Sequence, residues 1–186
     1  MVEYRIEVAD AFSVNTVVKN LRDADAREIL AAYGPGTSIP MKVFESYLCS
    51  RDSSFVAFAD NAPFCVFGVR RPCILSEIAV PWLVGTNLLP KHARRFARGS
   101  RAVVDTWSRH FPYMRNYVDE RNTLAKRWLQ WLGFELYSAE PFGAAGEPFH
   151  KFEMIRGSND VFHHGSDHGY VGRGGDQSVP ATAPRS

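Results

Sequence analysis

The basic residues in the second half of the chain are its most visible candidates for binding chemistry. Between residues 90 and 127 the sequence has ten Lys and Arg but only three Asp and Glu, a local excess of seven in a chain whose net charge is +2. Such a concentration favours an acidic protein or a nucleic acid as partner, although a solvated helix face explains it nearly as well. The predicted partner-binding residues are Lys91, Arg94, Arg95, Arg98, Arg101, Tyr170 and Arg173.

The cysteines and clustered histidines do not indicate a metal site. The three cysteines lack Cys-x-x-Cys spacing, so we expect buried free thiols and a reducing, intracellular setting for Cys49, Cys65 and Cys73. The histidines at 163, 164 and 168 have no carboxylate or thiol framework beside them. No run approaches the roughly 20 apolar residues of a membrane span, and the acidic N-terminus is not typical of a secretory signal. We therefore predict no metal and no membrane span.

Residues 114–134 predict a strand, a capped helix and a second strand in close succession. The segment MRNYV alternates apolar and polar residues, as a strand does. Asn122 can cap a helix, and Gly133 can take the left-handed conformation that ends one. Phe134 then restarts an apolar strand. Between the cap and the glycine, one apolar face is made by Leu124, Trp128, Leu129, Trp131 and Leu132.

The remaining patterns extend this unit to an α+β domain. Alternation and turn residues predict further strands at 4–9, 55–59, 63–69, 73–84, 134–142 and 149–155. Apolar stripes predict one or two helices over 13–33, a short helix at 41–48 and a long one at 90–109. Residues 157–186 are rich in Gly, Ser, Asp and Pro. We therefore expect a domain over 1–156 and an extended tail over 157–186 that a partner would order.

The helix after the strand at 114–118 carries a spacing that resembles the GCN5-related N-acetyltransferase (GNAT) superfamily. The superfamily pattern is Asn, two residues, Ala, seven residues, then Gly-Phe, and here it is Asn122, Ala125, Gly133 and Phe134. The resemblance implies a central mixed, mostly antiparallel sheet of about six to seven strands, flanked by helices. An ordinary capped helix that feeds a strand is the alternative explanation of the spacing.

The same resemblance implies chemistry that this chain matches poorly. A glycine-rich loop of the superfamily holds the diphosphate of acetyl-CoA on backbone amides, but the matching segment, Val84–His92, has one glycine, two leucines and a proline. The superfamily's general-acid tyrosine falls on Leu129, and Glu77 is the only candidate for its general base. We therefore expect no catalytic residue, no cofactor and no enzymatic activity.

A narrower resemblance is to the internal virion proteins of T7-like short-tailed bacteriophages, over roughly residues 50–156. It rests on the segments 82–86, 91–96, 113–118, 122–133 and 149–155. It implies a virion component, made in a bacterial host, that contacts portal, tail or fibre proteins and can contact DNA. Two alternatives remain open at this stage: an active acetyl-CoA-dependent N-acetyltransferase, and a nucleic-acid-binding module that uses the basic helix.

Overall fold

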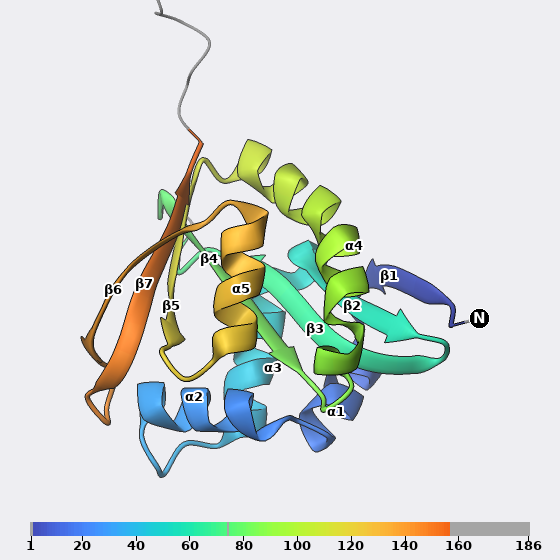
Figure 1. Ribbon diagram of the computed structural model, residues 1–186, viewed down its shortest axis with the longest axis horizontal. Helices are drawn as coiled ribbons and strands as arrows, with labels where there is room; N and C mark the ends of the chain where they lie inside the picture. Colours follow the sequence, from blue (N-terminus) through green and yellow to red (C-terminus); the bar gives the residue numbers. More distant parts are fainter. Residues whose placement is uncertain (1, 74, 157–186) are drawn as a thin grey trace, which may run out of the picture.

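The chain folds around one seven-stranded mixed sheet, which Figure 1 shows in the computed structural model. Residues 2–73 and 75–156 are described. The strand order is β1-β2-β3-β4-β5-β7-β6, and every neighbouring pair is antiparallel except β4 and β5. The strands are β1 (Tyr4–Val8), β2 (Ser54–Ala59), β3 (Ala62–Arg70), β4 (Ile78–Gly85), β5 (Tyr113–Asp119), β6 (Glu135–Phe142) and β7 (Glu147–Ile155). The predicted α+β architecture is confirmed.

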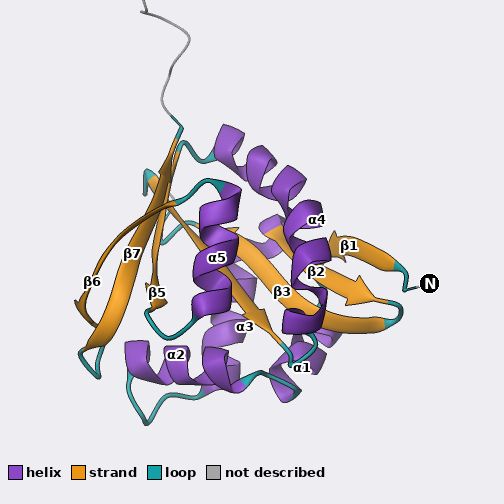
Figure 2. Ribbon diagram, in the orientation of Figure 1, coloured by secondary structure: helices purple, strands orange, loops and turns teal. Residues whose placement is uncertain are grey.

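Helices cover both faces of this sheet (Figure 2). Helices α4 and α5 lie on one face, and α1 and α3 pack on the opposite one. The helices are α1 (Ala11–Lys19), α2 (Asp23–Tyr33), α3 (Ile39–Ser50), α4 (Leu89–His110) and α5 (Thr123–Leu132), with a short 3-10 turn at Arg51–Ser53. None of the helices in the described ranges is long and apolar enough to cross a membrane.

Two apolar clusters hold these layers together. The larger one joins the sheet to α4 and α5 and includes Phe64, Phe67, Phe96, Trp107 and Leu129. The smaller one joins the other face to α1 and α3 and includes Val14, Val17, Val43, Val56 and Val66. Because both faces are covered, β3 is buried along six consecutive positions, Phe64 to Val69, which explains its almost uninterrupted apolar sequence.

Local sequence accounts for the helix ends that matter for the site. The side chain of Asn122 accepts a hydrogen bond from the Ala125 amide at 3.3 Å, so it caps α5 as predicted. Gly133 ends that helix with φ +97°, in the left-handed region. The side chain of Asp10 caps α1 through the Ser13 amide at 2.7 Å.

The β6–β7 turn rests on the C-terminal end of α2. The amides of Ala144 and Ala145 donate to the carbonyl oxygens of Ala32 and Ala31, at 3.0 and 3.1 Å. Gly143 adopts φ +73°, and a Cβ atom there would lie 2.6 Å from the Cα atom of Ala32. Only glycine therefore allows the turn to satisfy the last carbonyls of α2, which holds the β6–β7 turn against the C-terminal end of that helix.

Some local predictions need correction. The third strand of the β2–β4 meander begins at Ile78, not at residue 73. Of the cysteines expected to be buried, only Cys65 is, because it lies within β3, whereas Cys49 and Cys73 are exposed near the ends of elements. The predicted tail at 157–186 lies outside the described residues.

Candidate active site between the parted strands

The parallel strands β4 and β5 pair only at their beginnings. Ile78 lies opposite Tyr113 and Ala79 lies opposite Met114, after which the strands separate (Figure 1). Asn116 bridges the opening because its side-chain amide donates to the carbonyl oxygen of Pro81 at 2.9 Å. Pro81 itself has no N–H to offer a partner strand. The sheet therefore contains a wedge-shaped opening at its centre.

Two cavities meet at this opening, and the same five residues line both: Glu28, Trp82, Leu83, Asn116 and Tyr117. The cavity on the α2 and α3 side has a volume of about 180 Å³. The cavity on the α4 and α5 side has a volume of about 50 Å³ and is lined largely by apolar side chains, among them Trp107 and Trp128. Two molecules can thus approach one point from opposite faces of the sheet.

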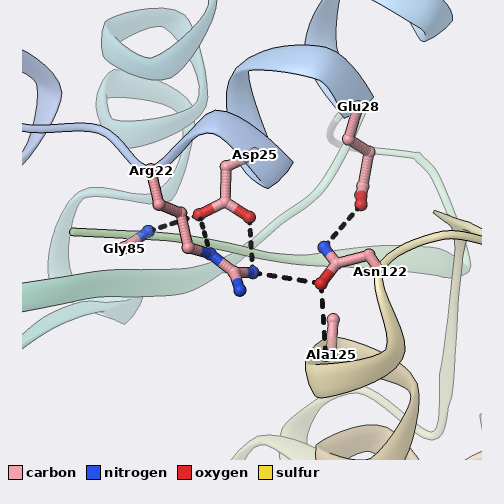
Figure 3. Close-up of polar contacts among 6 residues, drawn as sticks. All are labelled: Arg22, Asp25, Glu28, Gly85, Asn122 and Ala125. Atoms are coloured by element: carbon pink, nitrogen blue, oxygen red, sulfur yellow. Dashed lines mark hydrogen bonds and ion pairs between the residues drawn. The ribbon is translucent and has the colours of Figure 1, made fainter. Parts of the chain in front are cut away.

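A buried polar network connects α2 to the ends of both strands (Figure 3). Asp25 accepts two hydrogen bonds from the Arg22 guanidinium, at 2.7 and 2.6 Å, and a third from the Gly85 amide at 2.7 Å. Arg22 also donates to the side-chain oxygen of Asn122 at 3.2 Å. Arg22, Asp25 and Asn122 are all at most 5% exposed. The network therefore spans the opening from the end of β4 to the start of α5.

Glu28 is the titratable residue that both cavities share. Its carboxylate accepts a hydrogen bond from the side-chain amide of Asn122 at 2.7 Å, and the side chain is partly buried. Burial raises the pKa of this carboxyl from an ordinary value of 4.5 to about 8, and the charges of Asp25 and Asp119 add to the rise. A carboxyl with such a pKa can exchange a proton near neutral pH, as a general base must.

Most amides of the loop between β4 and α4 are already bonded within the chain. The Gly85 amide donates to Asp25, the Thr86 amide to the Phe64 carbonyl, and the Leu88 amide to the Thr86 hydroxyl. The Leu89 amide donates to the Thr86 carbonyl, and the next residue is a proline. These four amides would have to break their bonds before they could hold a phosphate.

The predicted partner-binding residues on α4 lie together on its outer surface. Lys91, Arg94, Arg95, Arg98 and Arg101 are all exposed, and we call this group the basic face. Within residues 2–73 and 75–156, none of the five has a carboxylate within ion-pair distance. Arg95 and Arg101 lie over the rings of Tyr4 and Trp131, at 5.4 and 5.1 Å from the ring centroids. Tyr170, Arg173 and the histidines at 163, 164 and 168 lie outside the described residues.

The two positions singled out for acid–base chemistry do not supply it. Glu77 is exposed just before β4 and lines neither cavity. Leu129 lines the cavity on the α4 and α5 side and is 3% exposed in the larger apolar cluster, but its side chain has no proton to give. The sequence reasoning missed Glu28. Its spacing offered a clue, because Asp25, Glu28, Ile29 and Ala32 follow the i, i+3, i+4, i+7 pattern of one helix face. Two carboxylates in line with apolar residues indicate a buried acidic pair.

Solved structures with the same fold are acetyltransferases. A ribosomal-protein-S5-alanine acetyltransferase from Vibrio fischeri matches with 12% identity and a TM-score of 0.58, over 83% of this chain and 94% of that one. The NatC complex bound to Gag peptide and CoA matches with 11% identity and a TM-score of 0.61, over 82% and 98%. The protein yncA of Salmonella typhimurium with its cofactor acetyl-CoA matches with 11% identity and a TM-score of 0.52, over 85% and 96%. A scan of family models and a search of curated proteins found no match.

At these identities the likeness establishes the GNAT fold, and it also contradicts several predictions. The matching structures are acetyltransferases, and nothing among them indicates an internal virion protein of a bacteriophage. The predicted virion location and the structural role at the portal or tail are therefore wrong. The predicted absence of a cofactor and of enzymatic activity is contradicted as well, because two of the matching structures contain CoA or acetyl-CoA.

The physical reason for these errors is that the predictions depend on only two parts of the site, the phosphate-binding loop and the position of the general acid. Both are altered in this chain, because the loop has a single glycine and position 129 is a leucine. The parted strands and the base at Glu28 depend on contacts between distant segments, such as the Asn122–Glu28 hydrogen bond. Those contacts have no local sequence pattern.

Proposed function

We propose that this chain is an acyltransferase that moves an acyl group from a CoA thioester to a primary amine. The observation that carries the proposal is the opening between β4 and β5, with one cavity on each face of the sheet and Glu28 where they meet. Two reactants that enter from opposite faces can be brought into line at one point, and positioning of this kind supplies much of an enzyme's rate enhancement. The CoA and acetyl-CoA in two structures of the same fold support this choice of donor.

For this function we call the cavity on the α4 and α5 side the donor cavity and the one on the α2 and α3 side the acceptor cavity. The residues of the donor cavity fit one part of a CoA thioester. Its largely apolar lining suits the thioester arm, and the thioester, when bound, supplies an activated carbonyl. The diphosphate fits less well because four amides of the loop are already bonded, so the side chains of Lys91 and Arg94 would have to balance its charge. The cavity of about 50 Å³ must also widen to admit the thioester arm.

The chain's own contribution to the reaction is mainly proton transfer and orientation. Glu28 accepts the proton that the amine loses as its nitrogen bonds to the acyl carbon and the carbon–sulfur bond breaks. Asn122 holds the Glu28 carboxylate in place at 2.7 Å and is itself fixed by the Ala125 amide and by Arg22. The sulfur can leave as a thiolate, because thiols have pKa values of about 8.5. A leucine at position 129 is therefore compatible with turnover.

Release of free thiol from acetyl-CoA, measured with the full chain and a set of amine acceptors, tests this function. We expect acceptor-dependent thiol release, and we expect Glu28→Gln to lower kcat/KM by about 10²- to 10⁴-fold, the usual contribution of a general base. Glu77→Gln is the matched control because Glu77 is exposed and lines neither cavity, so it should retain wild-type activity. Absence of acceptor-dependent release, or equal activity of wild type and Glu28→Gln, would refute the proposal.

A further inference from the structure

The acceptor cavity is chemically different at its two ends. Glu28 lines both cavities, whereas Tyr33, Lys42 and Arg70 line the acceptor cavity but not the donor cavity. Glu28 and Tyr33 both belong to α2 and are five residues apart, which corresponds to about 7.5 Å along a helix axis. The cavity therefore offers a base where it meets the donor cavity and cationic side chains away from that point.

The cationic end carries charge that neighbouring carboxylates do not fully balance. Lys42 forms an ion pair with Glu45 at 2.9 Å, and its ammonium lies 4.9 Å from the centroid of the Tyr33 ring. Arg70 also lines the cavity, yet in the part of the chain that the structure describes it has no ion-pair partner. Glu45 is exposed and does not line the cavity. The charge of Arg70 helps to lower the pKa of Glu45, but among the described residues its guanidinium forms no direct ion pair, so it can receive an anionic group from a ligand.

The walls between the two ends are aromatic and held in place. The rings of Tyr117 and Phe142 stack with centroids 3.9 Å apart, and the indole N–H of Trp82 donates to the hydroxyl of Ser50 at 2.8 Å. A volume of about 180 Å³ corresponds to the space of roughly six water molecules in the liquid. The cavity can therefore hold one or two residues of an extended chain, but not a folded partner.

We propose that the acyl acceptor is an extended chain with a primary amine at one end and a carboxylate farther along it, the carboxylate being bound by Arg70 with help from Lys42. This inference rests on the proposed function, since it assigns the amine to the Glu28 end. Carboxylate is the anion that a guanidinium binds through two parallel hydrogen bonds. Two sources share this chemistry: a peptide N-terminus with an acidic residue among its first positions, and a lysine side chain with a free carboxylate.

Binding of matched ligands to the full chain, measured by calorimetry without any acyl donor, tests the inference. The peptide pair is Ala-Asp amide and Ala-Asn amide, and the lysine pair is Nα-acetyl-lysine and Nα-acetyl-lysinamide. In at least one pair we expect the ligand with the carboxylate to bind about tenfold more tightly, as one charge-assisted hydrogen bond allows. The pair that shows the difference identifies the source of the carboxylate.

Two variants should change the preference for the carboxylate in opposite directions. Arg70→Gln should abolish the preference for the carboxylate, whereas Glu45→Gln should strengthen it, because it releases Lys42 from its ion pair. Glu77→Gln should leave both affinities unchanged. Equal affinity for both members of each pair, no binding of any ligand, or a preference that survives in Arg70→Gln would each overturn the inference.

The outcome is separable from that of the proposed function. If the ligands bind as expected but thiol release from acetyl-CoA never occurs, the proposed acceptor site is supported and the proposed reaction is refuted. If thiol release occurs with uncharged amines and Arg70→Gln has no effect on it, the proposed reaction is supported and the assignment of the acceptor is refuted.

Discussion

Replacement of Glu28 by glutamine should change how the stability of the protein depends on pH. The pKa of this carboxyl is about 8 in the folded chain, against an ordinary 4.5, so between these values the folded state binds more protons than the unfolded state. The stabilisation from Glu28 is therefore fully present below about pH 4.5 and is lost as pH rises through about 8. At 1.36 kcal/mol for each pH unit, this amounts to about 3 kcal/mol between pH 5.5 and 8.

Glutamine keeps an oxygen that can accept the hydrogen bond from Asn122 but does not titrate. Urea unfolding followed by tryptophan fluorescence at pH 5.5, 7 and 8 gives the free energy of unfolding of wild type and variant. We expect the stability of Glu28→Gln relative to wild type to increase by about 3 kcal/mol across this range. Glu77→Gln, which removes an exposed carboxylate, should follow the wild-type curve. If the difference in the free energy of unfolding between Glu28→Gln and wild type stays constant from pH 5.5 to 8, Glu28 has an ordinary pKa and cannot exchange a proton near neutral pH.

Three further predictions concern other parts of the molecule. Asp25→Ala should cost about 3–5 kcal/mol in thermal unfolding because it leaves the buried guanidinium of Arg22 unpaired; a loss below 1 kcal/mol would argue against the network. Gly143→Val should raise KM for the acceptor because its side chain would push the β6–β7 turn away from α2, whereas Gly146→Val, with a similar φ of +63° but open space, should not. Changing the five residues of the basic face to glutamine should abolish any salt-dependent binding of duplex DNA in fluorescence anisotropy; unchanged binding would exclude the basic face as the contact.

Features fixed by short segments could be predicted from the sequence. Asn122 and Gly133 lie at the two ends of α5, as expected, because a cap and a left-handed glycine act on neighbouring residues of the same helix. The predicted apolar strands at 55–59 and 63–69 correspond to β2 and β3, and Asp60 takes φ +55° in the tight turn between them. The stripe of α4 that includes Phe96 and Trp107 faces the sheet for the same local reason.

The candidate site could not be predicted in this way because it is assembled from distant segments. Asn122 was recognised as a helix cap, but its side chain also bonds Glu28, 94 residues away, and Arg22, 100 residues away. The spacing within α2 places Asp25 and Glu28 on one face, but the pKa of Glu28 also depends on its burial and on the charge of Asp119, which the sequence of α2 does not specify. The single glycine and the proline of the β4–α4 loop were visible in the sequence, but the role of Asp25 in occupying the Gly85 amide was not.

The most direct test of the acyltransferase site is a crystal structure with a bisubstrate analogue in which the sulfur of CoA is joined covalently to an acceptor amine. The account predicts that the analogue passes through the opening between β4 and β5, with the linked nitrogen within about 3–3.5 Å of the Glu28 carboxylate. Its thioester arm would lie in the donor cavity, and its phosphates would lie at the N-terminal end of α4, near Lys91. An analogue that binds only along the basic face, or one that leaves the opening between the strands empty, would contradict it.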